Sequence, residues 1–97
     1  MSILIRFTPE QLTAKQYDAT VSRLQETGDF PPTGLDYHVC FGTEGKLRVS
    51  EIWDSQEDLD AFRERLMPIL SEVGIDPGQP EMIKVHNVIS GRKLAAV

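Results

Sequence analysis

Cysteine is nearly absent from this chain, since Cys40 is the only one among 97 residues. A single thiol cannot form a disulfide within the chain and cannot complete a cysteine-based zinc site. No apolar run reaches the length of a membrane span, and the apolar start at residues 3–7 is too short for a secretory signal. The sequence therefore predicts a cytoplasmic protein with no membrane partner.

Positive charge is also scarce, because ten Lys and Arg residues face fifteen Asp and Glu residues, for a net charge of -5. Nucleic acids and anionic lipids are bound by clustered Lys and Arg, and the basic residues of this chain are scattered. We therefore expect no nucleic-acid partner. With 40% hydrophobic residues, the chain can build one core, which predicts a single domain over residues 1–97 with a tail from about 91 to 97.

Hydrophobic periodicity divides the chain into six segments. Two helix starts are marked by N-cap spacing, Thr13 with Gln16 and Ser55 with Asp58. The expected elements are a strand at 3–7, a helix from 13 to 28, strands at 35–41 and 47–53, a helix from 55 to 74, and a strand at 82–89. This βαββαβ order predicts a ferredoxin-like α+β fold, with a four-stranded antiparallel sheet and both helices on one face.

Pro68 lies inside the second expected helix. A proline there removes one backbone hydrogen bond and usually kinks or ends a helix. The apolar stripe nevertheless keeps its phase on both sides of Pro68, from Phe62 to Val73. We therefore predict that the helix continues through Pro68 with a bend.

The alternation along the hairpin assigns side chains to the two faces of the sheet. If Phe41 pairs with Leu47, every second side chain on each strand of the hairpin, beginning with these two residues, points toward the helices. On that side lie four residues with polar groups: Tyr37, Glu51, Trp53 and Asn87. The opposite face mixes polar residues with the apolar Leu4, Ile52, Met82 and Val88. Because no element remains to cover these apolar residues, we expect a second copy to do so in a homodimer.

The strand order, together with Glu51-x-Trp53-x-Ser55-x-Glu57 at the junction of the third strand and the second helix, resembles the dimeric α/β-barrel superfamily. Antibiotic biosynthesis monooxygenase-like proteins are its familiar members. The resemblance spans about residues 2 to 90. It implies a homodimer whose two sheets close a barrel, often with a small-molecule cleft between sheet and helices.

The resemblance also implies where catalytic groups would lie. Cofactor-free and haem-degrading members use an Asn on the first strand, a Trp on the third and a His on the second helix. Trp53 matches the Trp, but residues 3–7 contain no Asn and residues 55–73 contain no His. Neither haem ligation nor that oxygenase mechanism carries over, and we expect no cofactor.

Two interpretations fit the polar residues on the helix side. In the first, Trp53, Tyr37, Asn87 and Glu51 line a ligand cleft, with Glu51 as the candidate general base because partial burial raises a carboxyl pKa. In the second, Trp53 and Tyr37 are core aromatics, while Glu51 and Asn87 reach water at strand ends. The sequence leaves both open.

His38, His86 and Cys40 do not form a ligand-spaced cluster. We interpret the histidines as surface or interface residues and the thiol as a small hydrophobe, and we expect no metal site. The function that the sequence favours is binding of a small organic molecule in a cleft between sheet and helices. The alternatives are a cofactor-independent monooxygenase of the antibiotic biosynthesis type and a dimeric module without catalysis.

Overall fold

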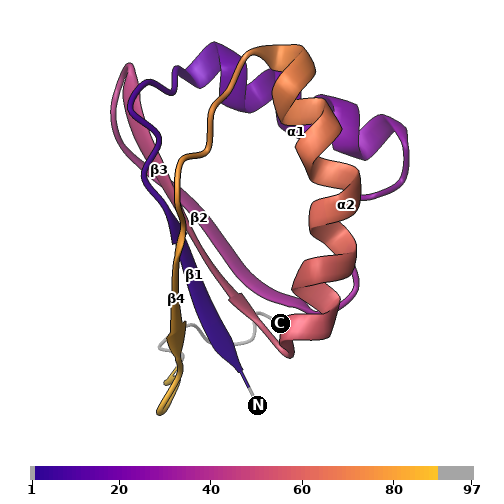
Figure 1. The fold of residues 1–97 in the computed structure, drawn as a ribbon, viewed down its shortest axis with the longest axis vertical. Coiled ribbons are helices and arrows are strands. Elements are labelled where there is room, and N and C mark those ends of the chain that lie inside the picture. Colours follow the sequence, from indigo (N-terminus) through magenta and orange to yellow (C-terminus); the bar gives the residue numbers. More distant parts are fainter. Residues whose placement is uncertain (1, 90–97) are drawn as a thin grey trace, which may run out of the picture.

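The computed structural model describes residues 2–89 and contains six elements (Figure 1). In chain order they are β1 (Ile3–Phe7), α1 (Ala14–Glu26), β2 (Leu35–Thr43), β3 (Lys46–Trp53), α2 (Gln56–Val73) and β4 (Glu81–Lys84). The strands form one antiparallel sheet in the order β2-β3-β1-β4. The predicted ferredoxin-like α+β fold is therefore confirmed.

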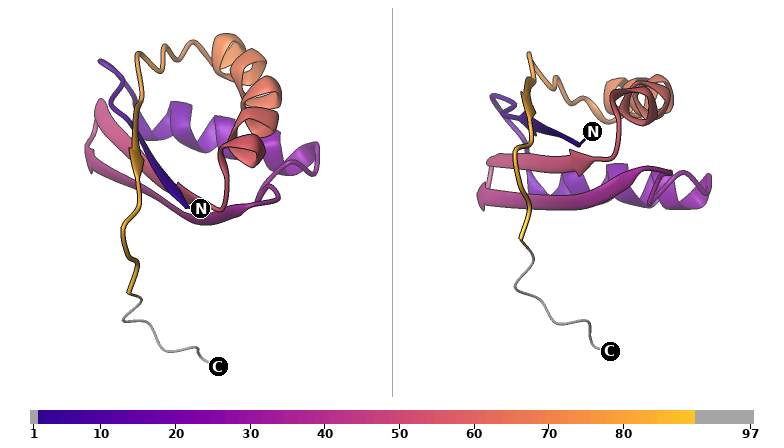
Figure 2. Two further views of the ribbon diagram at one scale, coloured as in Figure 1. Left: turned by 60° about the horizontal axis from the view of Figure 1, so that its bottom comes forward. Right: turned by 90° about the horizontal axis from the view of Figure 1, so that it is seen from below.

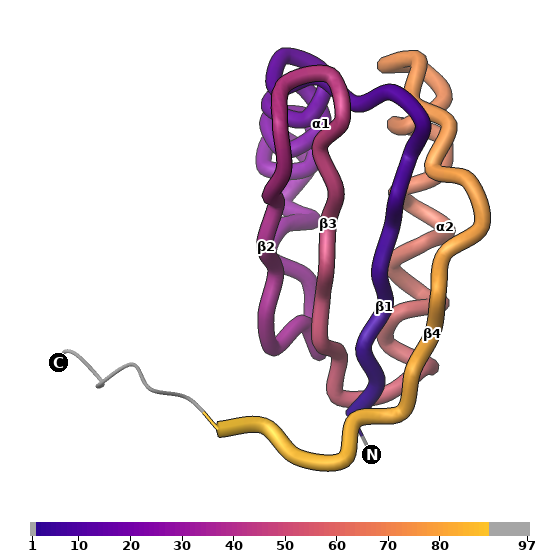
Figure 3. The backbone as a smooth tube through the Cα atoms, turned by 90° about the vertical axis from the view of Figure 1, so that its left-hand side faces the viewer, coloured from indigo at the N-terminus to yellow at the C-terminus, as the bar shows by residue number. Residues whose placement is uncertain are grey.

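Both helices lie on one side of this sheet, and the two further views in Figure 2 show the same layering. Figure 3 looks onto the other side, where no helix covers the four strands. Within residues 2–89, no helix is long and apolar enough to cross a membrane. The domain thus has a helix-covered face and an open face.

The helix boundaries follow the capping residues. Thr13 and Gln16 form a complete capping box at the start of α1. Ser55 accepts a hydrogen bond from the backbone of Asp58 at the start of α2, and Gly74 ends that helix in the left-handed conformation. These boundaries agree with the sequence prediction because each cap depends on residues within one turn.

The second helix runs through Pro68 without interruption, as predicted. Leu59 and Phe62 are buried before the proline, and Ile69 is buried after it. Burial of this stripe on the sheet offsets the backbone hydrogen bond that proline removes. The bend at Pro68 stays a prediction.

The main core lies between the sheet and the helices, and its largest fully buried side chains are Trp53, Phe62, Ile5 and Leu59. Ile5 comes from β1, Trp53 from β3, and the other two from α2. Tight packing of these side chains ties the second helix to the centre of the sheet.

The pairing of β2 with β3 differs from the prediction by one residue. Leu35 lies opposite Trp53, but Tyr37 lies opposite Ile52, so Asp36 is an extra residue on β2. Such a bulge turns the following side chains over, because the side-chain period of a strand is two. The predicted face of Tyr37, and of every later residue on β2, is therefore wrong.

The bulge exchanges the two faces of the sheet for the β2 side chains that follow Asp36. His38 is paired with Glu51 and Cys40 with Val49, so both turn toward the helices. Tyr37 faces away from the helices and is 53% exposed. A histidine therefore occupies the place beside Glu51 that the alternation assigned to a tyrosine.

The last strand is shorter than predicted, and its side chains lie on the faces opposite to those predicted. It pairs Met82 with Ile5 and Ile83 with Leu4, which places Met82 on the helix side and Ile83 on the open face. It ends at Lys84, so Asn87 lies beyond the sheet and is exposed. The alternation within one strand cannot determine its register against a strand that lies far away in the sequence. The tail from 91 to 97 lies outside the described residues.

Gly34 sits in the left-handed region with φ of +86°, at the entrance to β2. A Cβ at this position would collide with the side chain of Asp58 in the first turn of α2. We predict that Gly34→Ala lowers the free energy of unfolding by about 3 kcal/mol, since backbone strain and overlap act together.

The matched control is Gly28→Ala. Gly28 has a similar φ of +79°, but a Cβ there would meet nothing within 4 Å. We expect Gly28→Ala to cost about 1 kcal/mol, from backbone strain alone. Denaturant unfolding measures both values. Equal losses in the two variants would contradict a close approach between Gly34 and Asp58.

Candidate functional site

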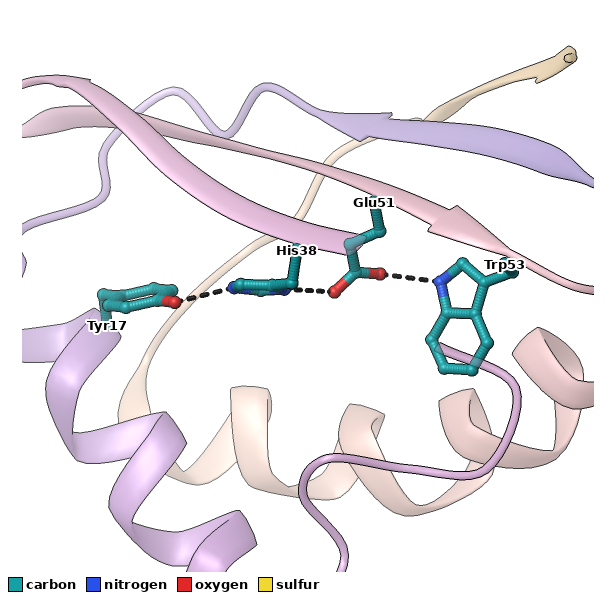
Figure 4. Close-up of polar contacts among 4 residues, drawn as sticks. All are labelled: Tyr17, His38, Glu51 and Trp53. Carbon is teal, nitrogen blue, oxygen red and sulfur yellow. Dashed lines mark hydrogen bonds and ion pairs between the residues drawn. The ribbon is translucent and has the colours of Figure 1, made fainter. Parts of the chain in front are cut away.

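Four side chains form a row of hydrogen bonds between the sheet and α1 (Figure 4). The Tyr17 hydroxyl lies 2.6 Å from His38 Nε2, and His38 Nδ1 lies 2.6 Å from Glu51 Oε2. The indole N–H of Trp53 donates to Glu51 Oε1 at 3.0 Å. Residues from α1, β2 and β3 therefore converge on a single carboxylate and a single imidazole.

Glu51 is the buried centre of this row, with 4% of its surface exposed. A carboxylate withdrawn from water is costly unless it accepts hydrogen bonds. Each of its oxygens has one partner, His38 on one side and Trp53 on the other. Within residues 2–89, no buried side-chain nitrogen or oxygen lacks a partner. Glu51 thus serves to hold its two neighbours in position.

The carboxylate also determines which nitrogen of His38 carries the proton in the neutral ring. An N–H at Nδ1 satisfies Glu51, which leaves the lone pair of Nε2 directed at the Tyr17 hydroxyl. A carboxylate in this position also stabilises the imidazolium that forms when Nε2 takes a proton. The Glu51–His38 pair is therefore arranged as an oriented base.

Tyr17 remains a phenol over the ordinary pH range. Burial, followed by the nearby Cys40, Glu51 and Asp18, raises the pKa of Tyr17 from 10.0 to about 12. Loss of its proton to water is therefore disfavoured, and the hydroxyl donates a hydrogen bond to His38 instead. Burial is also the main cause that raises the pKa of the Cys40 thiol.

Tyr17, His38 and Glu51 border a cavity of about 80 Å³ between the sheet and the two helices. One water needs roughly 10–15 Å³ by the same measure, so the cavity has room for several heavy atoms. Tyr17, His38 and Glu51 contribute mainly apolar atoms to its surface, because their polar atoms are hydrogen-bonded to one another. The apolar lining comes from both helices, β1, β3 and the flanking loops, and includes Phe7, Leu12, Val21, Leu24, Phe30, Val49, Phe62, Leu66, Leu70 and Ile75.

The structure separates the four residues that the sequence proposed. Glu51 lines the cavity, and Trp53 lies behind it as a fully buried partner that is not part of the lining. Tyr37 is on the open face, and Asn87 is exposed beyond β4. A ligand role for these residues stays a prediction, and of the four only Glu51 lines the cavity.

Tyr17 and His38 were missed as site residues. Tyr17 belongs to the apolar stripe of α1, and His38 was assigned to the wrong face. The available signal was Glu51 itself, since a carboxylate expected among apolar residues needs donors. His86, the other histidine, is exposed. No group of three His, Cys, Asp or Glu side chains in the described part of the chain could hold a metal ion.

No protein-family model matches the chain, and no curated protein matches it in sequence. Solved structures do match it. SnoaB from Streptomyces nogalater, described as a cofactor-independent oxygenase, is 10% identical with a TM-score of 0.60, over 91% of this chain and 94% of that one. A candidate antibiotic biosynthesis monooxygenase from Chloroflexus aurantiacus is 15% identical with a TM-score of 0.62, over 91% and 97%.

MupZ from Pseudomonas fluorescens is 13% identical with a TM-score of 0.60, over 84% of this chain and 69% of that chain. At such low identity these likenesses establish the fold and leave the chemistry open. They agree with the fold that the strand order predicts. The chain therefore shares its fold with solved structures described as candidate antibiotic biosynthesis monooxygenases and as a cofactor-independent oxygenase.

Proposed function

We propose that this protein binds a small, neutral and mostly apolar organic molecule in the cavity and takes a weakly acidic proton from it. The observation that carries this proposal is the hydrogen-bonded row of Tyr17, His38 and Glu51 at the border of an apolar cavity. An oriented imidazole with a carboxylate behind it is a common arrangement for general base catalysis.

The proton would travel through Tyr17. An O–H or activated C–H bond of the ligand breaks and its proton passes to the Tyr17 oxygen, while the Tyr17 proton passes to His38 Nε2 over the existing 2.6 Å contact. The products are a ligand anion and an imidazolium paired with Glu51. Net charge and electron count are unchanged, so this step needs no cofactor.

The buried carboxylate also restricts the ligand. Glu51 places a negative charge at the cavity wall, and the residues around it are largely apolar. A ligand that arrives as an anion would lose its hydration and meet a like charge. A molecule that is neutral until it reaches Tyr17 avoids both penalties.

A cofactor-independent monooxygenase is the second candidate, favoured by the same proton acceptor. Removing a proton from an organic substrate makes it electron-rich and a better reductant for dioxygen. SnoaB, which shares the fold, is described as an oxygenase of this kind. The His38–Glu51 pair would supply the base in this chain, from positions different from those that the family resemblance implies.

The open face of the sheet supports a homodimer. With the observed register it gathers apolar side chains from all four strands: Leu4, Tyr37, Phe41, Ile52 and Ile83. Tyr37, Phe41 and Ile83 are 53%, 39% and 46% exposed. Exposed apolar area of this extent on one side of a sheet favours a second copy as the cover. The single cysteine is consistent with a cytoplasmic location.

We predict that the site ionises a bound nitrophenol, whose phenolate absorbs in the visible. At a pH where the free probe is mostly protonated, the protein should increase the phenolate fraction by transferring the proton to His38. His38→Gln should abolish this increase, whereas His86→Gln, which changes an exposed histidine, should keep it. Absorbance titration measures both.

An oxygen electrode on the same mixtures separates the two candidate functions. Oxygen uptake that requires His38 and a bound substrate supports the monooxygenase. A probe that binds to the natural chain only as the neutral phenol contradicts the proton acceptor. The same conclusion follows if His38→Gln ionises the probe as the unchanged protein does.

We predict that Tyr17 titrates near pH 12. In a Tyr37→Phe background, Tyr17 is the only tyrosine, so its ultraviolet phenolate absorbance can be followed alone. Adding Glu51→Gln should lower this pKa, since a negative charge is removed, but leave it above 10.0 because burial is the main cause. Titration at 10.0 would contradict a buried hydroxyl.

The raised pKa of Tyr17 makes the stability of the fold depend on pH. The folded state holds the Tyr17 proton more tightly than the unfolded state does, so this contribution is fully present below pH 10.0 and is lost as the pH rises through about 12.

We predict that Ile52→Lys dissociates the homodimer, because the lysine would place an unpaired charge in the apolar interface. Ala61→Lys adds the same charge to the exposed side of α2 and should leave the dimer intact. Light scattering at micromolar concentration gives the mass of each variant. A monomeric natural chain would rule out the dimer.

A further inference from the structure

The loop between α1 and β2, residues 27–34, contributes one aromatic ring to the cavity. Phe30 meets the imidazole of His38 edge-on, with ring centroids 5.5 Å apart and planes at 83°. It also packs against Phe62 of α2 at 6.5 Å between centroids. Among the described residues, Phe30 is the one member of this loop that lines the cavity. Its ring therefore stands directly beside the proposed base.

The residue before Phe30 anchors the loop to α2. Asp29 Oδ1 lies 2.9 Å from Arg65 Nε, and Asp29 Oδ2 accepts a hydrogen bond from the Thr27 hydroxyl at 2.8 Å. The Asp29 N–H donates to the Leu24 carbonyl at 2.8 Å. The Arg65 guanidinium also lies 5.8 Å from the centre of the Phe62 ring, so one arginine touches both the loop and the cavity wall.

We propose that Phe30 limits the size of the molecule that can lie against His38, and that the Asp29–Arg65 ion pair holds Phe30 in that position. The inference rests on the proposed function, because it concerns the same cavity. An aromatic ring removed from a packed wall leaves space that the surroundings fill only in part. Removing the Phe30 ring should therefore admit a larger ligand at the imidazole.

The ion pair is suited to holding the loop in place reversibly. Side chains of Asp29 and Arg65 are 26% and 45% exposed, so water and salt weaken their attraction. Loosening this contact would free Phe30 to move without breaking the core beneath it. Size selection should therefore depend on Arg65, although Arg65 does not line the cavity.

The test uses benzene and naphthalene, whose binding to the intact protein is measured by nuclear magnetic resonance. Neither hydrocarbon has an acidic proton, so the result is independent of proton transfer to His38. We expect the natural chain to prefer benzene. Phe30→Ala should shift the ratio of the two dissociation constants toward naphthalene by about tenfold or more, as the larger ring buries more apolar area. Phe30→Leu, which keeps apolar packing, should shift it in the same direction.

Two arginine variants test the anchoring contact. Arg65→Gln should shift the ratio toward naphthalene by about threefold, because the pair is partly exposed. Arg23→Gln is the matched control, since it removes the 2.7 Å Arg23–Glu72 pair between α1 and α2 without touching the loop. An unchanged ratio in both Phe30 variants overturns the size limit. Equal ratios in the two arginine variants overturn the anchoring role.

The outcomes also separate this inference from the proposed function. A shift in the Phe30 variants, with nitrophenol bound only in its neutral form, supports the size limit and contradicts the proton acceptor. If nitrophenol is ionised but the ratio of the hydrocarbon dissociation constants is unchanged, the proton acceptor is supported and the size limit is contradicted. Failure of every variant and of the natural chain to bind either hydrocarbon overturns the size limit, and it overturns the proposed function as well if nitrophenol does not bind either.

Discussion

A carboxylate that is almost entirely withdrawn from water determines how the interior of this domain is arranged. Glu51 keeps its place beneath the helices because each of its oxygens accepts one hydrogen bond, from Trp53 and from His38. The second of these partners in turn orients the Tyr17 hydroxyl. One requirement, the pairing of a buried charge, thus connects the centre of the sheet to α1 and directs the second nitrogen of His38 at the Tyr17 hydroxyl.

That pairing depends on a single extra residue in the sheet. Asp36 forms the bulge, and it exchanges the faces of the residues that follow it on β2. Without the bulge, Tyr37 would lie beside Glu51 and His38 would face away from the helices. The bulge therefore builds the interior site. It also moves Tyr37 to the open face, where it adds to the apolar surface available to a second copy.

The cavity is assembled from parts that are distant in the sequence. Tyr17 comes from α1, Phe62 from α2, and Phe30 from the loop between α1 and β2, while the sheet supplies His38 and Glu51. No short motif contains these residues. The shared fold explains the layers, whereas individual side-chain contacts form the row from Tyr17 to Trp53.

The sequence by itself determined the six elements, their order, the caps at Thr13 and Ser55, and the continuity of α2, because each depends on residues close together along the chain. It also pointed to Glu51 as an acid in an apolar setting. The tertiary structure decided the faces of β2 and β4 and the identity of the partners of Glu51. The physical reason is that a strand alternates with a period of two, so one bulged residue or one step of register reverses every later side chain, and hydrophobic alternation does not reveal such a step.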